Sequence, residues 1–186
     1  MNGSRIEPHI LMLAPLFPPF KGAVSSRLSS FAKYWSRITN VTVVTPLSDP
    51  TGDGYQRISF PLTEVRLDFF KLVFRLPKLV RIAKHMMPDV VFVSIPTSWQ
   101  LLEGYLLSKR LGVPLILDIR DLPTSTYPKN EGSLLRRSFN FLMQSLSRYL
   151  IRKSNRIVTI TDLVRDELKS ICPSTSSEIK VIRNGS

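Results

Sequence analysis

Hydrophobic and polar residues follow two distinct patterns along this chain. Short apolar runs rich in β-branched residues alternate with longer segments in which apolar residues recur every three or four positions. The first pattern is typical of strands buried on both faces of a parallel sheet, and the second of helices that cover such a sheet. The patterns alternate along the chain, which predicts an α/β fold: a Rossmann-like parallel sheet with helices on both faces.

The boundaries of these elements follow from turn-forming residues and from breaks in the periodicity. The predicted strands span residues 9–15, 40–46, 57–61, 88–96, 113–121, 156–161 and 178–186. The predicted helices span residues 24–38, 66–87, 98–112, 133–153 and 162–171. Pro77 is expected to kink or split the second helix, because proline removes an amide donor and clashes with the preceding turn. Gly112 is expected to end the third helix in a left-handed cap.

Composition and charge limit the class of protein. A chain of 186 residues that is 43% hydrophobic can bury the core of one domain. Twenty-six Lys and Arg residues against 14 Asp and Glu give a net charge of +12, which favours anionic partners. With two histidines and the single Cys172, an internal disulfide is excluded and a zinc site is not expected. The first apolar run is broken by Pro15, which argues against an export signal, and we expect a cytoplasmic protein.

The candidate chemistry lies where predicted strands end, because ligands of open parallel sheets bind beyond the carboxyl ends of the strands. The stretch PPFKGAVSSR, residues 18–27, leads from the first strand to a helix N-terminus, where free amides and the helix dipole favour an anion. Gly22 would allow close approach of that anion. Further donors could come from Lys21, Ser25, Ser26 and Arg27. The alternative is a proline-stiffened turn with serine capping and solvated charges.

The fifth strand ends in the charged sequence DIRD, which contains Asp118, Arg120 and Asp121. Charge at the end of a buried strand is expected to be used or paired. A carboxylate here could orient a sugar hydroxyl or act as a base, and Arg120 could pair with a phosphate. The alternative is an internal Asp–Arg ion pair that closes the sheet edge.

Two further stretches carry weaker signals. Thr97 and Ser98 offer hydroxyl groups after the fourth strand, although capping of the next helix explains them equally well. Asn184 and Gly185 form a turn signal that occurs in any kind of protein. The chain has no G-x-G-x-x-G sequence after the first strand and no Walker A sequence, which disfavours ordinary nicotinamide, flavin or P-loop nucleotide binding.

Four of these segments together resemble the N-terminal domain of family 4 glycosyltransferases, which have the GT-B fold. The family's P-P-x-x-G-G-x-x-x-R loop is similar to PPFKGAVSSR, and its D-x-R-D segment to DIRDLPTS. Its sixth strand is similar to SNRIVTITD, and the start of its interdomain linker to EIKVIRNG. No single motif is specific, but the four occur in the family's order and the resemblance extends from His9 to Ser186.

The resemblance implies that the chain is one half of a GT-B fold. Residues 1–183 would form the N-terminal domain and residues 184–186 would begin the linker to a second domain, which is absent from this sequence. Family members transfer a sugar from a nucleotide-sugar donor, with retention and without a metal, to an acceptor that is often lipid-linked or a glycan. The N-terminal domain mainly binds the acceptor. With the second domain absent, we expect negligible transferase activity from this chain alone.

The family's functional positions carry over by motif. Gly22 takes the place of the first glycine of the loop and Arg27 that of its arginine, whereas Ala23 replaces the usual second glycine. Arg120 and Asp121 would face the interdomain cleft as the catalytic candidates. The candidates for acceptor or phosphate binding are Lys21, Gly22, Ala23, Ser26, Arg27, Thr97, Ser98 and Asp118. The hinge would be formed by Asn184 and Gly185.

The positive charge leaves several partners open. Two basic amphipathic segments, residues 69–87 and 133–154, could lie on an anionic membrane surface and bring the enzyme to a lipid-linked acceptor. The alternative is that they cover the sheet while their Lys and Arg side chains reach water. A second hypothesis is a non-catalytic half that binds a separately encoded domain. Nucleic acid is not expected, because no recognition motif accompanies the basic residues.

Overall fold

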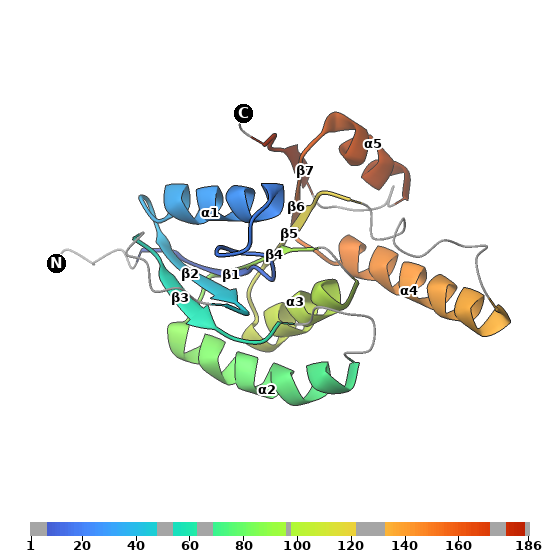
Figure 1. Ribbon diagram of the computed structural model, residues 1–186, viewed down its shortest axis with the longest axis horizontal. Helices are drawn as coiled ribbons and strands as arrows, with labels where there is room; N and C mark the ends of the chain where they lie inside the picture. Colours follow the sequence, from blue (N-terminus) through green and yellow to red (C-terminus); the bar gives the residue numbers. More distant parts are fainter. Residues whose placement is uncertain are drawn as a thin grey trace.

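The computed structural model describes residues 7–47, 54–62, 69–95, 98–121, 133–171 and 178–184. These residues form a parallel seven-stranded sheet in the order β3-β2-β1-β4-β5-β6-β7 (Figure 1). The strands are β1 His9–Leu13, β2 Asn40–Thr45, β3 Gln56–Ser59, β4 Val90–Ser94, β5 Leu115–Ile119, β6 Arg156–Thr159 and β7 Glu178–Val181. The helices are α1 Ala23–Trp35, α2 Phe69–Met86, α3 Ser98–Leu111, α4 Leu134–Arg152 and α5 Asp162–Ile171. The predicted α/β fold is confirmed.

The direction of the connections determines which face each helix covers. The chain moves from β1 to β2 toward one edge of the sheet, and from β4 onward toward the other edge. Right-handed crossovers therefore place α1 on one face and the later helices on the opposite face. Figure 1 shows α1 above the sheet and α2 and α3 below it. The reversal between β1 and β4 is the topological switch point, where the carboxyl ends of open parallel sheets form a binding crevice.

Both faces of the central strands are buried, which explains why their sequences are continuous apolar runs. On the α1 side, Met12, Val43 and Phe92 pack with Leu28 in one cluster. On the other side, a larger cluster joins alternate residues of the strands to α2, α3 and α4. The centre of the sheet is therefore packed on both faces.

Two predictions about helix ends and breaks have different outcomes. Of the two outcomes expected at Pro77, a kink or a split, the split is wrong, because α2 continues through this residue as one helix. Leu72, Leu76 and Leu79 on either side of the proline are buried, so packing against the core stabilises the helix on both sides of it. The left-handed cap is confirmed: Gly112 has a φ of 73° and its amide donates to the Ser108 carbonyl at 2.9 Å.

Candidate functional site

A buried ion pair joins the first helix to the carboxyl end of the fifth strand. Nε and Nη2 of Arg27 donate to Oδ1 of Asp118 at 3.2 and 3.1 Å. The two side chains are 2% and 0% exposed. Buried charges are tolerated when they are paired and hydrogen-bonded. The alternative of an internal Asp–Arg pair at this sheet edge is thus found, but its main arginine lies 91 residues before Asp118.

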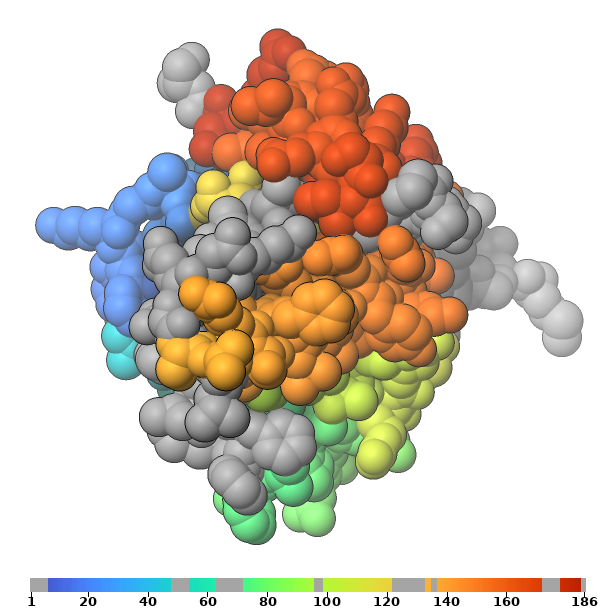
Figure 2. All heavy atoms as spheres, turned by 90° about the vertical axis from the view of Figure 1, so that its right-hand side faces the viewer, coloured from blue at the N-terminus to red at the C-terminus, as the bar shows by residue number. Residues whose placement is uncertain are grey.

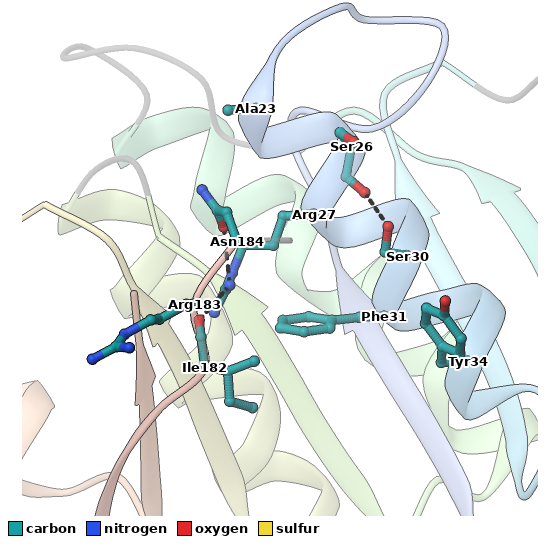
Figure 3. Close-up of a pocket in the computed structure, with 9 residues that line it drawn as sticks. All are labelled: Ala23, Ser26, Arg27, Ser30, Phe31, Tyr34, Ile182, Arg183 and Asn184. Carbon is teal, nitrogen blue, oxygen red and sulfur yellow. Dashed lines mark hydrogen bonds between the residues drawn. The ribbon is translucent and has the colours of Figure 1, made fainter. Parts of the chain in front are cut away.

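Arg27 also holds the segment that follows β7. Its Nη1 donates to the Ile182 carbonyl at 2.6 Å and to Oδ1 of Asn184 at 3.0 Å (Figure 3). The guanidinium carbon lies 4.5 Å from the centroid of the Phe31 ring. One side chain therefore ties together α1, β5 and the segment that contains Asn184, the residue expected to begin the hinge.

Arg120 lies on the other side of the Asp118 carboxylate. Its Nε is 3.9 Å from Oδ2 of Asp118, and its side chain is 12% exposed. Neither of these two atoms has a hydrogen-bond partner among the described residues. Burial raises the pKa of Asp118, although the charges of Arg27 and Arg120 oppose this rise. Arg120 is thus a partly desolvated cation whose Nε makes no hydrogen bond to the described residues, and a guanidinium is suited to bind an anion.

Burial also acts on the guanidinium of Arg120. It lowers the pKa of Arg120 from its usual value, and the neighbouring carboxylates of Asp118 and Asp121 oppose this change. Asp121 itself is exposed at the end of the DIRD sequence. An arginine stays protonated in proteins, so the site combines a fixed positive charge with an accessible carboxylate.

The loop before α1 depends on glycine because of its backbone conformation. Gly22 has a φ of 138° and a ψ of 168°, a region that is essentially restricted to glycine. A Cβ atom at Gly22 would meet no atom beyond the neighbouring residues within 4 Å, so the backbone conformation and not crowding by the protein accounts for glycine here. Lys21, which precedes this residue, is exposed.

Serine capping of this helix, the alternative interpretation of the loop, is not found. Gly22 is the N-cap residue and makes no side-chain capping bond, because α1 already begins at Ala23. Ser25 and Ser26 therefore lie inside the first turn, past the position from which a side chain can cap. The Ser26 carbonyl instead accepts hydrogen bonds from the hydroxyls of Ser29 and Ser30, both at 2.9 Å. The first amides of α1 have no side-chain cap and can receive an anionic group.

A pocket of about 470 Å³ lies between α1 and the segment after β7 (Figure 3). Four of its lining residues are among the predicted site residues: Ala23, Ser26, Arg27 and Asn184. The other five were not predicted: Ser30, Phe31, Tyr34, Ile182 and Arg183. Helical spacing is the signal that identifies three of these, since Ser30, Phe31 and Tyr34 follow Arg27 by three, four and seven positions.

The remaining predicted site residues lie elsewhere. Gly22 and Lys21 belong to the loop before α1, and the DIRD residues end β5 without lining the pocket. Ser98 begins α3, and its side chain lies outside the described part of the structure. Thr97 and Gly185 lie outside the described residues. The predicted site residues thus fall into two separate regions, the pocket beside Asn184 and the carboxyl end of β5. Arg27 contacts both regions.

The strand order and the polar carboxyl edge define a Rossmann-like α/β domain of the type that forms half of GT-B glycosyltransferases. A family model described as Glycosyltransferase Family 4 matches residues 24–185. The chain belongs to Glycosyltransferase Family 4. No curated protein gives a significant match to this sequence.

Several solved structures share the fold. Sucrose-phosphate synthase from Thermosynechococcus elongatus has a TM-score of 0.66 at 13% identity, and 96% of this chain covers 48% of it. A glycosyltransferase from Rickettsia africae has a TM-score of 0.64 at 14% identity, and the match covers 96% of this chain and 43% of that enzyme. Anabaena HepE in complex with UDP-glucose has a TM-score of 0.61 at 17% identity, and the match covers 96% of this chain and 44% of HepE. The chain therefore spans about half the length of these structures.

The conformation of Gly22 predicts a stability effect of its substitution. Gly22→Ala should lower the free energy of unfolding by about 1–3 kcal/mol, because alanine is strained at this φ and ψ. Ala23→Gly, at the adjacent helical position, serves as the control and should cost less. Urea unfolding followed by circular dichroism measures both values. A Gly22→Ala variant as stable as the original chain would contradict this account of the loop.

The buried pair predicts a strong coupling between its members. Arg27→Met should cost about 3–5 kcal/mol, because it leaves the Asp118 carboxylate buried and without its main partner. The same substitution should cost less in an Asp118→Asn background, where no carboxylate remains. Arg156→Met is the control, since its pair with Glu178 is more than half exposed and should contribute about 0–1 kcal/mol. Additive losses in the double-mutant cycle would show that the pair is not coupled.

Proposed function

We propose that this chain is the acceptor-side domain of a retaining glycosyltransferase that acts in the cytoplasm. The donor would be a nucleotide-sugar and the acceptor a lipid-linked molecule or a glycan. The observation that carries the proposal is the match to Glycosyltransferase Family 4 over residues 24–185, in a chain about half as long as the enzymes with the same fold. Residues 1–183 would form this domain, and residues 184–186 would lead into a second one.

The proposed step breaks the bond between the anomeric carbon and the diphosphate of the donor. A bond forms between the same carbon and a hydroxyl oxygen of the acceptor, with the anomeric configuration retained, and the departing diphosphate takes up the hydroxyl proton. Negative charge grows on the diphosphate during this step, so fixed donors near it lower the barrier. The proposed step uses no metal ion, as the resemblance to family 4 enzymes implies, and the site offers cationic groups for the diphosphate.

The described residues suit particular roles in that step. Arg120 is a cation with little contact with water, and its Nε makes no hydrogen bond to the described residues, so its guanidinium can bind a phosphate group of the donor or of a lipid-linked acceptor. The exposed carboxylate of Asp121 can accept a hydrogen bond from the acceptor hydroxyl. The loop at Gly22 leads into uncapped amides of α1, which favour an anion. Anabaena HepE, which has the same fold and was solved in complex with UDP-glucose, supports a nucleotide-sugar as the donor class.

A second candidate function is that of a non-catalytic half that docks with a separately encoded domain. Tyr34 and Ile182 favour it, because both are exposed apolar side chains that line the pocket beside Asn184. Apolar surface next to the end of a domain is typical of an interface with another domain.

The intact mass of the native product tests which of the two arrangements exists. The mass of this chain is 21.2 kDa, and we expect a native product of about twice that mass, because the chain spans about half of its structural neighbours. Mass spectrometry of the protein from its native source gives this value directly. A native product of 21.2 kDa would contradict the single-chain arrangement and favour the separately encoded partner.

Substitution of Arg120 tests the proposed site in a protein that contains both halves. Arg120→Gln should lower kcat/KM about 10- to 100-fold, because a charged hydrogen bond to a phosphate group is lost. Arg110→Gln is the matched control: Arg110 is exposed in the last turn of α3, at the opposite edge of the sheet, and its removal should leave turnover unchanged. Unchanged turnover and acceptor affinity in Arg120→Gln would remove this residue from the site.

A further inference from the structure

Helix α4 buries several polar side chains beside its buried apolar ones, and it exposes several large apolar side chains to solvent. Three of its polar residues are 5%, 2% and 0% exposed: Asn140, Gln144 and Ser147. Four of its large apolar residues are 80%, 66%, 62% and 51% exposed: Leu134, Phe141, Leu142 and Tyr149. We call these four residues the α4 stripe. A helix on the surface of a globular protein normally has the opposite arrangement, with its apolar stripe toward the core.

The orientation of α4 is nevertheless fixed by good packing. Met143 packs with Trp99 of α3, and both are buried. Leu150 and Ile151 belong to the main core cluster. The Ser147 hydroxyl donates to the Met143 carbonyl at 2.8 Å, and Nη2 of Arg148 donates to Oε1 of Gln144 at 3.3 Å. The inner face therefore satisfies part of its polar groups within the helix, and the exposed apolar face is a stable feature.

The α4 stripe forms one continuous line. Leu134 and Phe141 are seven residues apart, and so are Leu142 and Tyr149; seven residues are close to two turns, so each pair lies one above the other and the two pairs form adjacent rows along the helix. Leu142 lies beside Phe141. Figure 1 shows that the first turns of α4 extend beyond the sheet, and Figure 2 shows the helix on the surface, viewed from that side.

Basic residues accompany this apolar line. Residues 134–152 include four arginines and no aspartate or glutamate. Among them, Arg137 and Arg152 are exposed, and Lys153 follows with its Nζ 5.6 Å from the centroid of the Tyr149 ring. Helix α2 on the same face of the sheet has a similar composition, with five Lys or Arg residues, no acidic residue and an exposed Phe74. Aromatic and aliphatic residues flanked by basic ones are typical of helices that lie in a membrane interface.

We propose that the α4 stripe binds the headgroup region of an anionic lipid bilayer. The four stripe residues enter the boundary between headgroups and acyl chains, while Arg137, Arg152 and Lys153 contact lipid phosphates. The net charge of +12 favours this occupant over a second copy of the chain, because like charges repel. The inference rests on the proposed function for its purpose, which is access to a lipid-linked acceptor, but not for its physical basis.

Binding of the 186-residue chain to vesicles tests the proposal without donor or acceptor. We expect binding to vesicles of phosphatidylcholine and phosphatidylglycerol in equal parts, weak binding to phosphatidylcholine alone, and loss of binding as salt is added. Phe141→Ser combined with Leu142→Ser should weaken binding at least about tenfold, because the inserted apolar area is removed. Arg152→Gln should weaken it about fivefold. Flotation with the vesicles measures all of these values.

Matched controls separate the stripe from general surface properties. Ile38→Ser combined with Leu163→Ser removes two equally exposed apolar residues on other surfaces, and Arg110→Gln removes an exposed charge away from α4. These controls should bind as the original chain does, and circular dichroism should show all variants folded.

Absence of binding to anionic vesicles, or equal loss in the controls, overturns the proposal. Self-association that the stripe variant abolishes, without vesicle binding, would assign the stripe to a protein contact instead. Failure of the Arg120→Gln test with intact vesicle binding would overturn only the proposed function.

Discussion

The buried carboxylate of Asp118 is the constraint on which the arrangement of this domain depends. A charge at the end of a central strand must be paired, because water cannot reach it there. Arg27 meets that need with two hydrogen bonds and uses its remaining nitrogen for the segment after β7. Through Arg27, the buried carboxylate of Asp118 therefore fixes the position of α1 and of the segment that follows β7.

The same constraint divides the roles of two arginines. Arg27 makes only internal contacts: the Asp118 carboxylate balances its charge, and Asp118, Ile182 and Asn184 accept its hydrogen bonds. Arg120 lies near the other oxygen of the same carboxylate at 3.9 Å, too far for a strong hydrogen bond. Its Nε makes no hydrogen bond to the described residues, and the residue follows β5 at the edge where ligands of parallel sheets bind. Motif matching alone treats both residues as cleft-facing, whereas the geometry makes one a positioning residue and leaves the other for an anion.

Much of the fold follows from local pattern, and the site follows less well. The buried strands appear as apolar runs because both faces of the sheet are covered, and every strand was predicted within a few residues. The partner of Asp118 is 91 positions away, and no local rule selects Arg27 over Arg120. The chemistry of proline alone predicted a kink or a break at Pro77, but the helix continues through it, because residues on both sides of the proline pack in the core: Leu72, Leu76 and Leu79. Periodicity identified α4 as amphipathic, yet only its packing on α3 shows which face is outside.

The α4 stripe belongs to the helix that follows β5 in the chain, which connects the proposed membrane contact to the candidate anion site. Because Arg120 and Asp121 follow β5 and α4 begins at Leu134, 12 residues of chain separate the candidate anion site from the first residue of the α4 stripe. The first turns of α4 extend past the sheet, on the side shown in Figure 2. A bilayer bound along that line would lie next to the carboxyl edge. An acceptor whose lipid stays in the bilayer would then need to raise only its phosphate and sugar to reach Arg120.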